Sequence, residues 1–176
     1  FSEERFAYGE DIVSNYQPSG LKLLPYGEAD IKLTALILAI ENNPARYDQV
    51  SLKQYLYEVY KNKESNLDEI VLSLLGLASL DEPILLSLRE IQDEPKLNVE
   101  EKLYIALAFN NLGSKDEAKK IYKDVFKELA KDEGSVYATA LGAVVASGIG
   151  EIEQADLLWE FVELTGFNNE LSNLYE

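Results

Sequence analysis

The sequence predicts an all-α protein: about four pairs of stacked antiparallel helical hairpins, forming a curved α/α solenoid or partial toroid. Three observations favour this fold class. Capping residues recur before segments of helical length, apolar residues in those segments follow helical spacing, and the chain matches itself at shifts of 35 and 37 residues. The only extended segment, 21–24, is too short and isolated to indicate a sheet.

Side chains that can cap a helix mark where the helices begin. Asn66, Asn98 and Ser114 each precede a glutamate by three residues, which is the spacing of a capping box. Other candidates are single N-cap residues, and glycines that can end a helix in the left-handed conformation. The single N-cap candidates are Ser51, Asp81 and Ser135, and the glycines are Gly113, Gly150 and Gly166.

These signals divide the chain into nine predicted helices. The predicted ranges are 30–42, 51–63, 67–79, 82–93, 99–112, 115–130, 136–148, 151–165 and a short ninth over 168–175. In 51–63 and 115–130 the apolar residues recur with helical spacing, which is typical of amphipathic helices. The helices that begin at residues 30, 99 and 136 are instead apolar on nearly every side, so we expect them to be enclosed on both sides.

The repeats pair these helices into hairpins. A shift of 37 residues aligns 112–125 with 149–162, and a weaker match at 35 residues aligns 70–82 with 105–117. One hairpin cannot bury its own apolar face, so its neighbours must cover it. We therefore expect four hairpins over 29–165.

We expect one domain over 1–176, because 176 residues suit a single core. The apolar residues of 1–28 would seal the first hairpin as an N-terminal capping extension. The segment 166–176 would form a C-terminal capping helix, folded back over a second apolar stripe on helix 151–165. That stripe consists of Leu157, Phe161 and Leu164.

The hairpins over 103–165 share one further pattern. Each has small or aromatic residues in its first helix, a glycine at the turn, and an alanine and an aromatic residue in its second helix. The first hairpin has Ala106, Phe109, Gly113, Ala118 and Tyr122 at these positions, and the second has Ala143, Ala146, Gly150, Ala155 and Trp159. The segment resembles a tetratricopeptide repeat. This resemblance implies a scaffold that binds peptides or partner proteins and has no catalytic activity of its own.

The apolar first helices carry a second resemblance. An open tetratricopeptide groove would need polar residues on these helices, whereas 103–109 contains only apolar residues and tyrosine. The pattern is similar to the α/α toroid domains of terpenoid cyclases and of bacterial α-2-macroglobulin-like surface proteins. Because the chain has no thioester Cys, this resemblance implies no chemistry.

The residue types that are missing exclude many catalytic devices. The chain has no Cys, His or Met, which excludes disulfides, thiolate nucleophiles, Cys/His zinc sites and Ser-His-Asp triads. We therefore expect no enzyme, no cofactor and no metal site. The alternative is a carbohydrate-active or other ligand-binding domain with its site in a cavity between inner helices. The polar residues available for such a site are Glu41, Asn42, Asn110 and Asn111.

The charge of the chain restricts its partners. It has 16 basic and 32 acidic residues, and no Lys or Arg follows Lys131, whereas nine acidic residues do. Such a surface repels nucleic acid and anionic lipid, and it leaves a protein or peptide partner, including a basic one, as the expected class. No uninterrupted run of 18 apolar residues is present, so we expect no membrane insertion.

Two aromatic residues are the predicted partner-binding residues. Tyr57 falls off the apolar stripe of its helix and Tyr47 lies in a long loop, and exposed tyrosines are favoured in interfaces. The start at Phe1 without Met favours an excised piece of a larger protein. Lys outnumbers Arg 13 to 3, which indicates a bacterial composition compatible with a cell-surface or a cytoplasmic protein.

Overall fold

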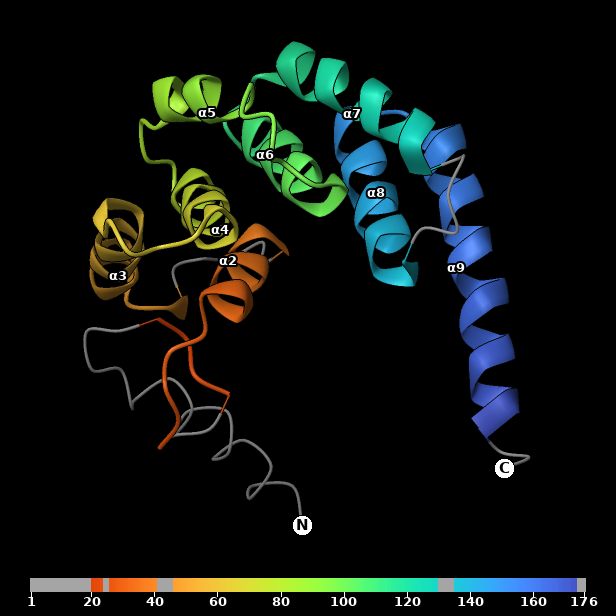
Figure 1. Ribbon diagram of the computed structural model, residues 1–176, viewed down its shortest axis with the longest axis horizontal. Coiled ribbons are helices and arrows are strands. Elements are labelled where there is room, and N and C mark those ends of the chain that lie inside the picture. The colour runs from red at the N-terminus through yellow and green to blue at the C-terminus, as the bar shows by residue number, and fades with distance from the viewer. Residues whose placement is uncertain (1–19, 24–25, 41–45, 130–134, 174–176) are drawn as a thin grey trace. The chain divides into compact units, whose positions relative to one another are not determined.

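The protein is all-α, as predicted (Figure 1). The computed structural model describes residues 20–23, 26–40, 46–129 and 135–173, the last eight of these by their backbone alone. These residues form eight helices and no strand. The helices are α2 (Ile31–Ile40), α3 (Gln49–Lys61), α4 (Leu67–Ser79), α5 (Leu85–Ile91), α6 (Val99–Asn111), α7 (Lys115–Leu129), α8 (Val136–Ile149) and α9 (Ile152–Asn173).

The chain divides into two compact units, Phe1–Ser87 and Leu88–Glu176. The boundary falls inside α5, the shortest of the described helices. Our expectation of a single domain with an N-terminal cap at 1–28 stays a prediction, and residues 1–19 lie outside the described part. The expected C-terminal cap at 166–176 does not form a separate helix over its described residues, because α9 runs through Asn173.

In the first unit, α2 and α3 both pack against α4. Every residue of α4 from Val71 to Ala78 is buried, so α4 is the core helix of this unit. In α2 only Thr34, Ala35 and Leu38 are buried, and Ile40 is exposed. The expected enclosure of this helix on both sides is therefore wrong, because α4 covers one face of it and leaves the other more open.

The segment before α2 is attached to that helix by hydrogen bonds. The backbone N–H of Leu21 donates to Thr34 Oγ1 at 2.8 Å, and the N–H of Asp30 donates to the Leu21 carbonyl at 2.9 Å. The Leu21 side chain is buried, whereas Leu23 is exposed. Leu21 is thus one residue of the expected capping extension that does reach the core.

The second unit contains two stacked hairpins. α6 pairs with α7 and α8 pairs with α9, while α8 also packs against both α6 and α7. Every residue from Leu103 to Phe109 in α6 is buried, which confirms the predicted enclosure of this helix. α8 is enclosed only in part, because Tyr137 and Val144 remain exposed.

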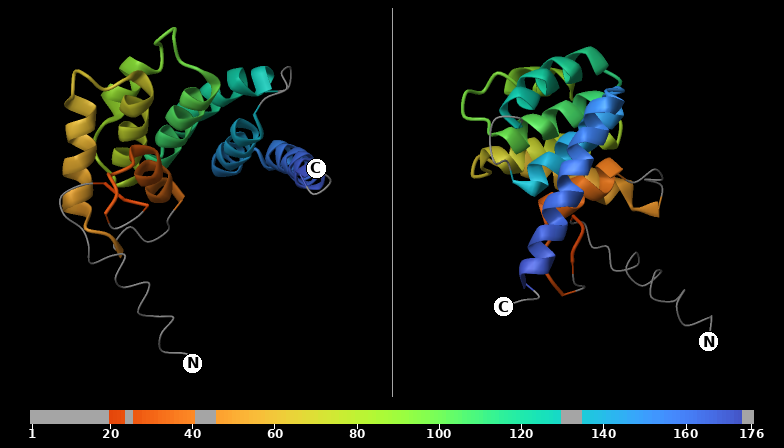
Figure 2. Two further views of the ribbon diagram at one scale, coloured as in Figure 1. Left: turned by 60° about the horizontal axis from the view of Figure 1, so that its bottom comes forward. Right: turned by 90° about the vertical axis from the view of Figure 1, so that its right-hand side faces the viewer.

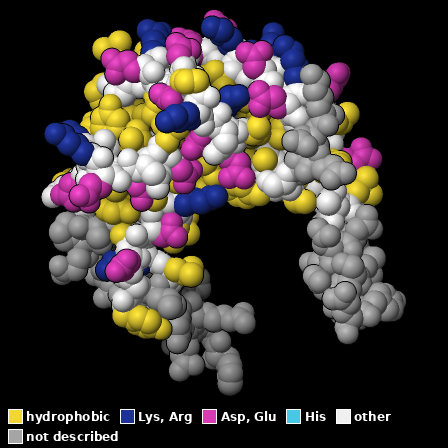
Figure 3. Space-filling view, in the orientation of Figure 1, with side chains coloured by type: hydrophobic (Ala, Val, Ile, Leu, Met, Phe, Trp, Pro, Cys, Tyr) yellow, Lys and Arg dark blue, Asp and Glu magenta, His cyan; other side chains and the backbone are white. Residues whose placement is uncertain are grey.

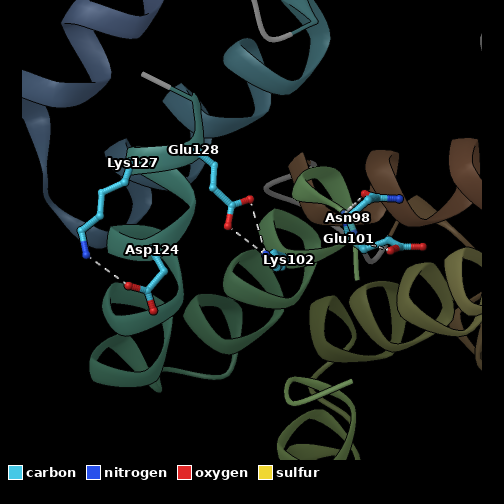
Figure 4. Close-up of polar contacts among 6 residues, drawn as sticks. All are labelled: Asn98, Glu101, Lys102, Asp124, Lys127 and Glu128. Carbon is cyan, nitrogen blue, oxygen red and sulfur yellow. Dashed lines mark hydrogen bonds and ion pairs between the residues drawn. The ribbon is translucent and has the colours of Figure 1, made fainter. Parts of the chain in front are cut away.

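Most of the predicted helix ends are confirmed. Capping boxes form at Asn66 with Glu69 and at Asn98 with Glu101, where the Asn98 side chain accepts from the Glu101 N–H at 3.0 Å (Figure 4). Ser135 caps α8 by accepting from the Ala138 N–H at 3.0 Å. The turn glycines Gly113 and Gly150 adopt φ of 77° and 85°, as expected of left-handed helix ends.

Two predicted N-caps are wrong. α3 begins at Gln49, because the Asp48 side chain accepts from the N–H groups of Val50 and Ser51 and caps the helix three residues before the predicted cap Ser51. Asp81 adopts a left-handed φ of 57° after α4, and α5 begins only at Leu85. The N–H groups of Asp81 and Glu82 donate to the carbonyls of Ala78 and Leu77, so these two residues end α4, and α5 is shorter than the predicted 82–93.

The predicted break at Gly166 is also wrong. α9 runs from Ile152 to Asn173 as one helix, which Figure 2 shows without interruption. A single glycine costs a helix only about 1 kcal/mol, and neither proline nor a capping pair reinforces the expected turn. The backbone over 168–173 therefore extends α9 instead of turning back along it.

Candidate partner-binding surfaces

Tyr57, a predicted partner-binding residue, is half-buried on α3 and its hydroxyl is already engaged. It donates to Glu82 Oε2 at 2.8 Å, and Lys61 Nζ lies 5.2 Å from the centre of its ring. Lys53 Nζ contacts the other oxygen of the same carboxylate at 2.6 Å. The ring thus belongs to a polar cluster that joins α3 to the loop after α4.

The cluster shifts two pKa values. Hydrogen bonds from Lys53 and then Tyr57 hold the pKa of Glu82 below its ordinary value, so this carboxylate stays charged. Burial and the bond to Glu82 raise the pKa of Tyr57, so its hydroxyl stays protonated at neutral pH. These properties suit a structural link better than a reactive site.

Tyr57 also lines a groove of about 560 Å³ on the surface of α3. The other lining residues are Gln54, Glu58, Lys61 and Asn62. Tyr47, the second predicted residue, is half-buried just before α3 and is not part of this lining. The structure therefore does not bring the two tyrosines into one groove, and their role in binding stays a prediction.

The largest group of exposed apolar side chains lies on the hairpin of α8 and α9. Trp159 is 50% exposed and Leu157 is 60% exposed. Ala155 and Leu158 are buried and form the face of α9 that packs on α8. The exposed large apolar residues of this hairpin are Tyr137, Val144, Ile152, Leu157, Trp159, Phe161 and Leu164.

Part of this group surrounds a groove of about 320 Å³ between the two helices. The small residues Ala143 and Ala155 are buried in the floor, and Val144 and Trp159 are exposed at the sides. One carboxylate, Asp156, also lines the groove. The remaining lining residue is Ser147.

At 3.6 residues per turn, the stripe of Leu157, Phe161 and Leu164 lies on the side of α9 opposite Trp159. The sequence predicts this stripe, together with a C-terminal segment that folds back and covers it. All three side chains are exposed to about half or more, as the unbroken course of α9 explains.

Sequence reasoning missed Trp159 as a surface residue. The self-match aligns it with Tyr122, which is fully buried on α7. A signal was present in the neighbouring helix α8. None of its residues is charged, although Val144 and Ser147 are exposed, whereas the outer face of an ordinary surface helix carries charged residues.

The polar residues named for an internal ligand site are not gathered into a cavity. Asn110 and Asn111 lie half-buried at the end of α6, and neither lines the two grooves described above. Asn110 Oδ1 and the Tyr122 hydroxyl are buried without a hydrogen-bond partner among the described residues. Glu41 and Asn42 lie outside the described residues. The alternative of a ligand-binding domain stays a prediction.

Among the described helices, none has the length and apolar character needed to cross a membrane, and no cluster of acidic side chains there could hold a metal ion. Comparison with protein-family models, curated proteins and solved structures finds no match. The helices pack in a repeat-like way, and the tetratricopeptide and toroid resemblances stay predictions.

Proposed function

We propose that the chain is a non-catalytic helical-repeat module that binds a protein or peptide partner through the hairpin of α8 and α9. The observation that carries this proposal is the group of seven large apolar side chains that this hairpin leaves exposed. Contiguous exposed apolar surface commonly marks an interaction site on soluble proteins. Val144 and Trp159 form one such surface beside the groove between the two helices, and Leu157, Phe161 and Leu164 form a second on the opposite side of α9.

The composition of the surface supports a protein partner. Aromatic residues are enriched in interfaces, and Tyr137, Trp159 and Phe161 all contribute to this hairpin. A buried tryptophan is often the residue that contributes most to binding, and Trp159 retains half of its surface for such a contact.

The rest of the hairpin is suited to hold this surface rigidly. α8 is buried along Leu141 to Ala143 and packs on α6, α7 and α9. Gly150 makes the turn between α8 and α9 in the left-handed conformation. A rigid surface loses little conformational entropy on binding, which favours affinity.

A peptide selection tests this function. The intact chain would be used to select binders from a displayed library of random peptides, and binding would be measured by fluorescence anisotropy. We expect enriched peptides to lose affinity at least tenfold, or about 1.4 kcal/mol, on Val144→Gln or Leu157→Gln. Both side chains are exposed, so these variants should fold.

The matched control is Val50→Gln, which replaces an exposed valine on α3 in the other unit. It should leave binding unchanged. Tyr57→Phe tests the second predicted surface in the same assay. The proposal fails if no peptide is enriched, or if enriched peptides bind the hairpin variants as tightly as the original chain.

A further inference from the structure

The groove between α8 and α9 combines three properties that are not shared by the groove on α3. Its floor is made of small side chains, its exposed wall includes Trp159, and the helices that form it carry no Lys or Arg. Each property restricts the kind of partner that the groove can accept.

The charged side chains on the two helices that form the groove are all acidic. Asp156 lines it, and Glu153, Glu160 and Glu163 are exposed on the same helix. No ion pair to these four carboxylates is found within the described part of the chain. In Figure 3 the described part of α9, at the right, carries hydrophobic and acidic side chains and no basic ones.

This charge pattern disfavours a second copy of the chain as the occupant. A symmetric contact would bring two sets of these carboxylates together, and juxtaposed like charges oppose association. A cationic partner would instead gain favourable electrostatic energy while it covers the apolar surface.

The shape of the groove favours a helix. Ala143 and Ala155 on the floor allow the backbone of a third helix to approach closely, since no long side chain intervenes. The exposed residues Tyr137, Val144 and Ser147 of α8 follow one another at spacings of seven and three, so they form a line along the helix. A partner helix with apolar residues at matching spacing would lie along that line.

We propose that the groove between α8 and α9 binds a basic amphipathic helix of a partner protein. The apolar side of that helix covers Val144 and Trp159, and its Lys or Arg side chains face Asp156 and the neighbouring carboxylates. This inference rests on the proposed function and specifies the chemistry of the partner.

The only tryptophan of the chain is Trp159, so its fluorescence reports directly on the groove. The probe is a capped Leu/Ala/Lys peptide of about 18 residues, roughly 27 Å long as a helix, with one apolar face. Two comparison peptides have Glu in place of Lys, or the same composition in scrambled, non-amphipathic order. We expect the Lys peptide to cause a saturable blue shift, weakened by salt, and the two comparison peptides to cause none.

Charge reversal locates the contact. Asp156→Lys should weaken binding of the Lys peptide on the order of tenfold, because it places a like charge in the groove. The control Asp124→Lys makes the same change of net charge at an exposed position of α7 and should alter the affinity less than about twofold. Equal losses in the two variants would show that only overall charge matters and would overturn the inference.

Other outcomes also decide the question. A blue shift that grows with protein concentration alone, together with a dimer in sedimentation, would assign the groove to a second copy. Equal binding of the Glu or the scrambled peptide, or no saturable shift at all, would reject a basic amphipathic helix. If library peptides of another character still bind through the hairpin, the proposed function stands while this inference fails. If no peptide binds, both fail.

Discussion

The two hairpins of the second unit have similar sequences and different surroundings. Tyr122 on α7 and Trp159 on α9 occupy equivalent places in the repeat, yet Tyr122 is fully buried and Trp159 is half exposed. α7 packs against both α6 and α8, whereas the principal neighbour of α9 is α8. The comparison teaches that the repeat specifies which side chains face a neighbouring hairpin, and that the neighbours then determine how much of each side chain is buried.

The largest expected effect comes from truncating the two aromatic residues. Tyr122→Ala should lower the free energy of unfolding by about 3 to 5 kcal/mol, because it leaves a cavity in a packed core. Trp159→Ala should cost only about 1 to 2 kcal/mol, because half of the side chain is already in water. Urea unfolding followed by far-UV circular dichroism measures both. Equal losses would mean that α9 is as well covered as α7, which would remove the basis of the proposed binding surface.

A smaller difference in stability is expected between substitutions at the N-terminal caps of α6 and α8, the first helices of the two hairpins. In α6 the Asn98 and Glu101 side chains cap each other's backbone N–H groups, whereas in α8 Ser135 caps through one side-chain hydrogen bond. Asn98→Ala should cost about 1 kcal/mol and Ser135→Ala about 0.5 kcal/mol. Asn98→Asp keeps an acceptor at the cap and serves as the control, with a loss close to zero. The same unfolding measurement applies, and a loss for Asn98→Asp as large as that for Asn98→Ala would contradict the capping role.

Much of the fold could be predicted from local sequence signals. The helix that starts after Asn66 and the one that starts after Asn98 were located to within a residue at each end, because capping boxes and apolar spacing act within a single turn of chain. Where two signals compete, prediction fails. Asp48 precedes Ser51 and caps α3 first, and the glycine at 166 is too weak a signal to end α9 against its neighbours.

The candidate site was less predictable, because exposure depends on packing between helices. The sequence indicated the stripe of Leu157, Phe161 and Leu164, yet it could not show that these side chains stay exposed while α9 continues to Asn173. It also aligned Trp159 with Tyr122 but did not indicate that only Tyr122 would be fully buried. A groove formed by Ala143 of α8 and Ala155 of α9 requires the distance between two helices, which no local pattern contains.

The hydroxyl of Tyr122 offers the smallest and most specific test of the comparison. It is buried with no hydrogen-bond partner among the described residues, so removing it leaves the packing of the ring intact and relieves a desolvated polar group. At pH 7, Tyr122→Phe should therefore change the free energy of unfolding by less than about 1 kcal/mol, and in the stabilising direction.

Alkaline pH should enlarge this difference. Burial, and secondarily the charge of Glu151, raises the pKa of Tyr122 to about 12, above the ordinary value of 10.0 that the unfolded chain has. The unfolded chain then loses this proton first, so stability that is complete below pH 10 declines as pH rises from 10 to 12. Tyr122→Phe lacks this decline, while Tyr55 and Tyr57, whose pKa values are also raised, titrate in both proteins and cancel from the difference.

Urea unfolding at a series of pH values should show the variant gaining stability over the original chain above pH 10. A difference that stays constant up to pH 12 would mean that the Tyr122 hydroxyl reaches water, and that the core of the first of the two hairpins is as open as the groove beside Trp159.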